Sequence, residues 1–149
     1  MTTMTPLPST RKKARQLLVQ ALYQWQLAGG GPVAIEAQFR ADNDLRKVDV
    51  DYFHDLLHGI LAAVDELDAT YARYLDRGLH ELDPVSRALL RIGTYELLHR
   101  IDIPYRVAIN EAVNLAKAFG PEDAHRYVNG ILDKVAAASR KLEVAARTR

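Results

Sequence analysis

The fold of this chain is decided by residues 103–134, which read IPYRVAINEAVNLAKAFGPEDAHRYVNGILDK. Asp102 and Pro104 are typical of a helix start, because an acidic cap and a first-turn proline both suit the unpaired N–H groups there. Gly120 and Pro121 are typical of one helix ending and the next beginning. Apolar residues repeat at helical spacing on both sides of this corner: Ile109, Ala112, Val113, Ala116 and Phe119 before it, and Val128, Ile131, Leu132 and Val135 after it. The stretch therefore predicts an antiparallel helix pair at the core of an all-helical domain.

The remaining sequence predicts more helices and no strands. We expect helices over about residues 9–28, 33–43, 50–79 and 84–100. The third is predicted as one long helix, because its apolar residues alternate by four and three as in a bundle seam. These residues are Phe53, Leu57, Ile60, Val64, Leu67, Tyr71 and Tyr74.

The helix over residues 84–100 is apolar nearly all round, so we expect it at the centre of the domain. Arg87 and Arg91 lie one turn apart on it, and we expect them to pair with acidic residues of the long helix. The alternative is that they point at a ligand.

Length and composition fit one compact domain. The chain has 149 residues, is 48% hydrophobic and contains no cysteine, which excludes disulfides and thiolate chemistry. No apolar run approaches the roughly 20 residues of a membrane span, and no signal peptide is evident, so we expect a cytoplasmic protein without membrane contact. We predict a disordered tail over residues 1–8, a helical domain over 9–140 and a basic tail over 141–149.

The net charge of +1 is unevenly distributed along the chain. Residues 36–83 carry a net charge of −7, whereas the segments on either side each carry +4. The four basic residues of the first segment are Arg11, Lys12, Lys13 and Arg15. They fall in the first turns of the first helix, where the helix dipole disfavours cations. A feature that opposes local stability favours a functional reading, here a phosphate site beside unpaired backbone N–H groups. The alternative is a basic tail without a role.

A second apolar line runs along the first helix. Val19, Tyr23 and Leu27 are spaced by four and lie apart from the main buried stripe. They either widen the stripe that faces the core or face a partner protein, since tyrosine is enriched at interfaces. Both readings remain open from the residues alone.

Residues 54–58, HDLLH, form a pattern that resembles a metal site. Two histidines at i and i+4 share one helix face, as zinc sites require. Asp55 replaces the glutamate of the catalytic motif, however, and no third ligand stands at a motif-defined spacing. We therefore predict solvent-facing histidines, no metal site and no cofactor.

Catalytic motifs are also missing from the sequence. The glycines at 29–31 end a helix and lack the lysine and hydroxyl residue of a P-loop, and there is no nucleophile elbow. The sequence predicts a binding protein rather than an enzyme.

The start of the last predicted helix is a candidate for reading RNA bases. Asp123 would repel phosphate, so it suits a base-edge acceptor, and Tyr127 could stack on a base. The alternative is that Glu122 and Asp123 cap the helix while Tyr127 packs. Lys117 joins this candidate set, although its shared face with Asn110 and Asn114 also suits hydrogen bonding between helix ends and loops.

Several motifs resemble the bacterial NusB family of transcription antitermination factors. They are RKKAR (11–15), VQALYQWQ (19–26), VDVDYFHDLLHG (48–59), LRIGTYEL (90–97), VAINEAVNLAKAFG (107–120) and VNGILD (128–133). The resemblance covers nearly the whole chain, in the family's order and spacing. It implies six to seven helices in two packed bundles.

The resemblance also implies a function and its residues. Proteins of this kind bind the boxA element of ribosomal RNA leader transcripts together with NusE, a small-subunit ribosomal protein, and load onto RNA polymerase with other Nus factors. The RNA-binding residues that it implies are Arg11, Lys12, Lys13, Arg15, Asp123 and Tyr127, and Lys117 completes the predicted RNA-binding set. The residues implied to bind NusE are Tyr23, Leu27, His80, Ser86 and Arg87. The family often has phenylalanine at Tyr127, and the segment 78–86 matches it less well.

Two other functions are alternatives to this one. A related RNA-binding domain is fused to ribosomal RNA methyltransferases, but no methyltransferase sequence follows here. The chain could instead be a helical interaction module that binds a protein or itself, as a homodimer, without specific RNA binding.

Overall fold

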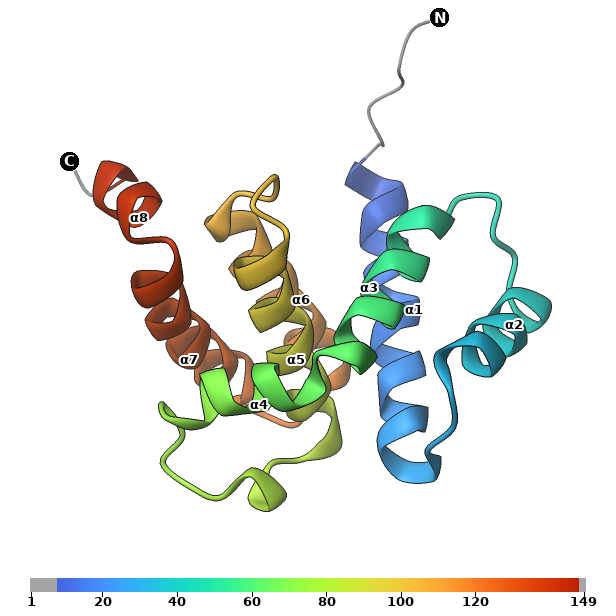
Figure 1. Cartoon of the computed structure of the whole chain (residues 1–149), viewed down its shortest axis with the longest axis horizontal. Coiled ribbons are helices and arrows are strands. Elements are labelled where there is room, and N and C mark those ends of the chain that lie inside the picture. The colour runs from blue at the N-terminus through green and yellow to red at the C-terminus, as the bar shows by residue number, and fades with distance from the viewer. Residues whose placement is uncertain (1–7, 148–149) are drawn as a thin grey trace, which may run out of the picture. The chain divides into compact units, whose positions relative to one another are not determined.

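The computed structural model describes residues 8–147, and these residues form helices without a strand (Figure 1). They hold eight α-helices and one short 3₁₀ helix, where six to seven helices were predicted. The all-α prediction is confirmed. The chain divides into two compact units, of which unit 1 ends at Leu61 and unit 2 begins at Ala62.

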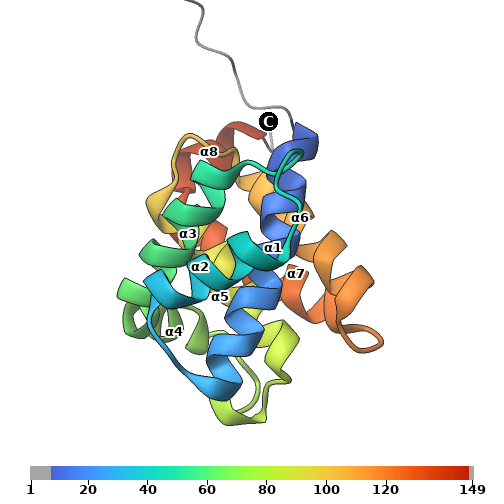
Figure 2. The ribbon, with the colours of Figure 1, turned by 90° about the vertical axis from the view of Figure 1, so that its right-hand side faces the viewer.

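Unit 1 is a three-helix unit, coloured blue to green in Figure 2. Its helices are α1 (Pro8–Ala28), α2 (Pro32–Asp42) and α3 (Val50–Ala62). Their apolar faces are buried, and the rings of Phe39 and Phe53 meet with centroids 6.2 Å apart. The N–H of Asp49 donates to the carbonyl of Thr10 at 3.0 Å. This bond ties the loop before α3 to the first turn of α1.

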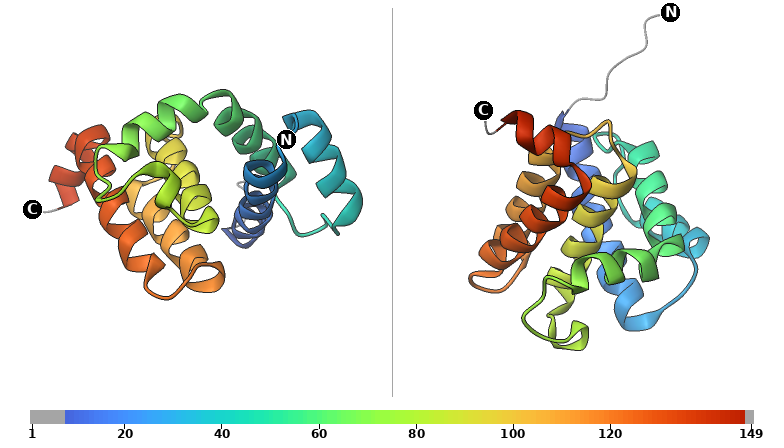
Figure 3. Two further views of the ribbon diagram at one scale, coloured as in Figure 1. Left: turned by 90° about the horizontal axis from the view of Figure 1, so that it is seen from below. Right: turned by 60° about the vertical axis from the view of Figure 1, so that its left-hand side comes forward.

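Unit 2 is built around three packed helices, α5, α6 and α7, which lie side by side in Figure 3. Its elements are α4 (Val64–Ala72), η1 (Leu79–Glu81), α5 (Pro84–His99), α6 (Tyr105–Phe119), α7 (Ala124–Ser139) and α8 (Lys141–Arg147). The Asp83 carboxylate accepts from the N–H of Ser86 at 2.9 Å and so caps α5. Helix α5 packs on α4, α6 and α7 and is buried on most sides, which confirms its predicted central place.

The prediction of one long helix over residues 50–79 is wrong. Ala63, with φ −112° and ψ 15°, leaves the helical region and separates α3 from α4, and α4 already ends at Ala72. The predicted apolar residues are buried on both sides of the break. Leu57 is buried in unit 1, and Leu67 is buried in unit 2. The spacing of the apolar residues therefore predicted which residues are buried, but it did not predict whether the helix is continuous.

The helix pair over 103–134 is confirmed as α6 and α7, but both helices start later than predicted. Asp102 does not cap α6; it pairs with Arg100, and Pro104 takes the cap position. Pro121 does not start α7, which begins after Asp123. Gly120 does follow the last residue of α6, as predicted. The position requires glycine, because a Cβ there would lie 2.8 Å from the Ala116 carbonyl oxygen.

Arg87 and Arg91 differ in their partners. The Arg91 guanidinium pairs with the Asp68 carboxylate at 2.8 Å, as predicted. Arg87 was predicted to pair with an acid as well, but it donates to the Leu79 carbonyl oxygen at 2.8 Å and braces the turn before α5.

The structure describes only part of the two predicted tails. Residues 1–7 of the N-terminal tail lie outside the described residues, and Pro8 is already in α1. Residues 141–147 of the C-terminal tail form α8. Its Glu143 carboxylate accepts from the N–H of Tyr105 at 2.8 Å, which docks α8 at the start of α6. None of the described helices combines the length and hydropathy needed to cross a bilayer.

Candidate nucleic-acid interface

The basic residues of α1 divide into two pairs with different surroundings. Arg15 is only 3% exposed and donates to the Tyr52 hydroxyl at 3.2 Å. Arg11 lies with its guanidinium 4.3 Å from the centre of the Tyr52 ring and 3.7 Å from the Asp49 carboxylate. Both arginines thus help to hold α1 on α3. Because Arg15 is buried in this way, its predicted phosphate contact does not fit the structure.

Lys12 and Lys13 are exposed, and Lys13 lines a surface hollow of about 570 Å³. The other residues that line it are Asp44, Arg46 and Lys47, from the loop between α2 and α3. Arg46 holds Asp44 at 2.7 Å, but both side chains are largely exposed, and an exposed pair of this kind exchanges readily for another anion. The hollow therefore gathers three cations and one carboxylate in unit 1.

A second hollow, of about 280 Å³, lies in unit 2 between the turn before α7 and the turn before α5. Asp123 stands at its rim in the left-handed conformation, with φ 66°. The Asp123 side chain does not cap α7, and its contact with Arg126 is long, at 3.9 Å. The capping role that was the alternative for Asp123 is therefore not what the structure has. Its carboxylate is exposed as an acceptor.

Tyr127 lines the same hollow and is held on two sides. The Tyr127 hydroxyl donates to Asp76 at 3.0 Å, and the Arg77 guanidinium lies 4.4 Å from the ring centre. Burial and this hydrogen bond raise the pKa of Tyr127, whereas the hydrogen bonds from Arg77 and Tyr127 lower the pKa of Asp76. The ring is thus fixed as a neutral aromatic surface, as base stacking requires.

The sequence did not single out Asp76 and Arg77, nor Arg46 and Lys47. Both pairs lie in acidic stretches whose summed charge hides them. The only signal that the sequence offered was that Arg46 and Lys47 form a basic pair in a predicted loop. Lys117, which was singled out, is exposed near the end of α6 and does not line the hollow.

The predicted partner residues divide between the two units. In unit 1, Tyr23 and Leu27 are exposed, Leu27 to 64%, whereas Val19, at the start of the same line, is 3% exposed and belongs to the core. Val33, which the sequence pattern did not point to, is 73% exposed at the start of α2. In unit 2, His80 is exposed, whereas Ser86 is only 2% exposed and Arg87 braces the turn before α5. Ser86 thus does not fit a direct partner contact.

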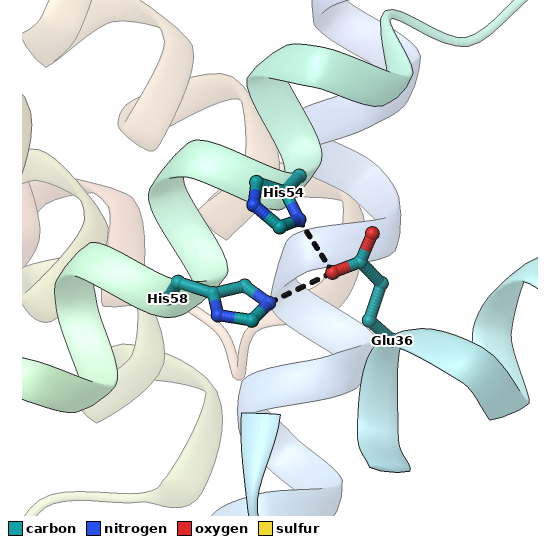
Figure 4. A group of neighbouring side chains, drawn as sticks. All are labelled: Glu36, His54 and His58. Carbon is teal, nitrogen blue, oxygen red and sulfur yellow. Dashed lines mark hydrogen bonds and ion pairs between the residues drawn. The ribbon is translucent and has the colours of Figure 1, made fainter. Parts of the chain in front are cut away.

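Of the two histidines of α3, His54 is exposed, as predicted, and His58 is half-buried, but both rings also contact a carboxylate of α2 (Figure 4). His54 Nδ1 and His58 Nε2 both lie against Glu36 Oε1 of α2, at 2.7 and 2.8 Å. Burial raises the pKa of Glu36, but hydrogen bonds from Arg40, His58 and His54 outweigh it and lower the pKa to about 2. A third metal-type ligand therefore exists, supplied by another helix rather than by the motif.

The structure thus defines a class: an all-helical binding protein of two small units, one with a basic helix start and one with a polar aromatic hollow. A model of the NusB family matches residues 12–137. The transcription antitermination protein NusB of Alcanivorax borkumensis is 56% identical over 140 residues, which cover 94% of this chain and 93% of that protein. That of Teredinibacter turnerae is 55% identical, with 91% and 92% covered.

Two solved structures share the fold. T. maritima NusB matches with a TM-score of 0.79 and 31% identity, covering 96% of this chain and 99% of that one. A structure of antitermination factors NusB and NusE in complex with dsRNA matches with a TM-score of 0.77 and 25% identity, covering 89% and 99%. The chain belongs to the NusB family. Its function is transcription antitermination, and it is not an enzyme.

Proposed function

We propose that this chain binds a boxA-like single-stranded RNA of ribosomal RNA transcripts together with NusE, and joins the antitermination complex on RNA polymerase. The observation that carries the RNA part is the hollow of unit 2, where an exposed carboxylate and a fixed aromatic ring stand together. A carboxylate accepts from base amino groups, and an aromatic ring stacks on bases. Lys12 and Lys13 of α1, with Arg46 and Lys47, supply the phosphate contacts.

The exposed apolar residues at the end of α1 support a protein partner. Tyr23, Leu27 and Val33 are large apolar side chains that face solvent around the α1–α2 corner of unit 1. An exposed group of this kind is typical of an interface. We assign it to NusE, with His80 and the turn before α5 as a further contact.

The test is a binding titration with a boxA-like RNA and a scrambled control, with and without NusE. We expect a preference for the boxA-like RNA that NusE strengthens. Lys12→Ala with Lys13→Ala should weaken binding to both RNAs, since phosphate contacts carry no sequence information. The matched control is Lys134→Ala with Lys141→Ala, two exposed lysines outside the proposed surfaces.

The partner surface is tested by Leu27→Asp, which should remove the strengthening by NusE and leave the binding of RNA alone unchanged. Leu142→Asp is its control, because Leu142 is an exposed leucine of α8. Equal binding to both RNAs, unaffected by NusE, would contradict the proposal. A homodimer in sedimentation that Leu27→Asp dissociates would then favour the interaction module.

A further inference from the structure

We propose that Glu36, His54 and His58 form a binding site for a divalent transition-metal ion of the Zn²⁺ class, which joins α2 to α3. All three residues belong to unit 1, and none of them is among the proposed RNA-binding or partner-binding residues.

The first support is convergence of the right donor atoms. One carboxylate oxygen and two imidazole nitrogens lie within 4.8 Å of one another, and they come from two helices (Figure 4). In a tetrahedral site with metal–ligand distances of 2.0–2.1 Å, neighbouring donors lie about 3.3 Å apart. Glu36 Oε1 lies 2.7 Å from His54 Nδ1 and 2.8 Å from His58 Nε2. Each of the two ring nitrogens therefore has to move about half an ångström away from Glu36 Oε1 to admit the ion.

The second support is that the carboxylate is already oriented. Arg40 approaches the other carboxylate oxygen, with Nε 2.8 Å from Glu36 Oε2. This leaves Oε1 directed at the two imidazole rings. A residue that holds a ligand from behind fixes its direction toward the metal.

The third support is the difference in exposure among the three ligands. The Glu36 side chain is 9% exposed, whereas that of His54 is 47% exposed. The protein therefore closes one side of the site and leaves the other open, where water completes the coordination. Three protein ligands with an open position are typical of zinc bound by two histidines and a carboxylate.

The donor set selects the class of ion. Imidazole suits Zn²⁺, Co²⁺, Ni²⁺ and Cu²⁺, whereas Mg²⁺ and Ca²⁺ prefer oxygen ligands alone. On binding, each neutral ring moves its proton from the nitrogen that faces Glu36 to its outer nitrogen. The metal then takes the place of two hydrogen bonds.

The test is titration of the full-length, tag-free protein with Co²⁺, followed by its visible absorption bands, and then with Zn²⁺. We expect saturation at one Co²⁺ per chain, displacement by Zn²⁺ and no response to Mg²⁺. Thermal unfolding should shift to higher Tm as Zn²⁺ rises, because the ion binds only the folded chain.

The variants are His58→Gln and Glu36→Gln, which keep hydrogen-bonding side chains at both positions. Each should weaken Zn²⁺ binding by more than the roughly 100-fold that changes to outer-shell residues cost. The matched control is His99→Gln, since His99 pairs with Glu66 at 2.5 Å without a second histidine. Circular dichroism checks that each variant is folded.

Loss of the 1:1 Co²⁺ signal in the two ligand variants, and not in His99→Gln, supports the site. Absence of a saturable signal in the unaltered protein overturns the proposal. So does a Zn²⁺ response that His58→Gln leaves intact, because the three residues would then be only a hydrogen-bonded clip between α2 and α3.

Discussion

Arg140 is a buried cation that holds the end of α5 to the segment that follows it. Its guanidinium donates to the carbonyl oxygens of Glu96, Leu97, Arg100 and Ile103 at 2.8 to 3.1 Å, and pairs with Glu143 at 2.7 Å. These carbonyls lie where α5 ends and cannot all bond within the helix. One side chain thus supplies donors to four carbonyl oxygens, of which those of Glu96 and Arg100 also accept from the backbone N–H groups of Arg100 and Ile103.

Replacing Arg140 by methionine should lower the free energy of unfolding by about 3–5 kcal/mol, because four carbonyl oxygens and the Glu143 carboxylate each lose one hydrogen bond at once. Urea unfolding followed by circular dichroism measures this change. The control is Arg126→Met, whose exposed guanidinium makes only a 3.9 Å contact and should change stability by about 0.5 kcal/mol or less. Equal, small effects from both variants would show that the buried network contributes little.

At Tyr127 the two roles of the side chain can be separated. Tyr127→Phe removes the hydrogen bond to Asp76 but keeps the ring beneath Arg77. We expect it to retain most of the affinity for a boxA-like RNA. Tyr127→Ala should lose roughly 5- to 150-fold, the equivalent of one base stack of about 1–3 kcal/mol. Fluorescence anisotropy at constant salt measures both, and equal losses would mean that the hydrogen bond, not stacking, matters.

Among the elements, α5 and α7 pack closely together at Gly93. A Cβ at Gly93 would lie 2.5 Å from Cδ1 of Leu132, which is itself fully buried. By contrast, Gly130 on α7 is exposed, and a Cβ there meets no atom within 4 Å. The packing of α5 on α7 therefore requires glycine at position 93, whereas no neighbouring atom requires it at position 130.

Gly93→Ala should destabilise the protein by about 1–2 kcal/mol, because crowding in a packed core costs more than the helix gains from alanine. Gly130→Ala should instead stabilise it, by about 0.5–1 kcal/mol, since alanine favours a helix interior. Thermal and urea unfolding give both values. If the two substitutions had the same sign, the close approach of α5 and α7 would not be what requires Gly93.

The elements also show how far the sequence could be read. The pair α6 and α7 was predictable because each has a continuous apolar stripe and the Gly120 corner lies between them. The break at Ala63 was not, because no proline, glycine or missing apolar position marks it. Likewise, His54 and His58 were predictable as a pair on one helix face, but their meeting with Glu36 depends on the packing of α2. The spacing of residues along the sequence predicts which of them share a helix face. Contacts between helices depend on the tertiary structure and could not be predicted in this way.

The same limit applies to the basic cluster of α1. The sequence placed Arg11, Lys12, Lys13 and Arg15 in the first turns of a helix, which is where they are. It could not separate the buried Arg15 from the exposed Lys13, because Arg15 is covered by Tyr52 of α3. Nor could it bring Arg46 beside Lys13, because this depends on the loop before α3.

At the scale of the whole molecule, a net charge of +1 gives little overall attraction for RNA. Affinity for phosphate must then come from local groups of cations. In unit 1 these are Lys12, Lys13, Arg46 and Lys47, of which the last two come from the acidic middle of the chain. Each phosphate contact releases counterions, so the dependence of affinity on salt counts the contacts.

For three or four contacts to single-stranded RNA, we expect the logarithm of the association constant to fall with the logarithm of salt concentration with a slope of about −2 to −3. Arg46→Ala with Lys47→Ala should reduce the steepness by about 1.4, or about 0.7 for each phosphate that is no longer neutralised. Lys134→Ala with Lys141→Ala should leave the slope unchanged. Titrations at four or more salt concentrations measure it. An unchanged slope in the Arg46 and Lys47 variant would confine the phosphate contacts to α1, since an exposed cation that meets no phosphate does not alter counterion release.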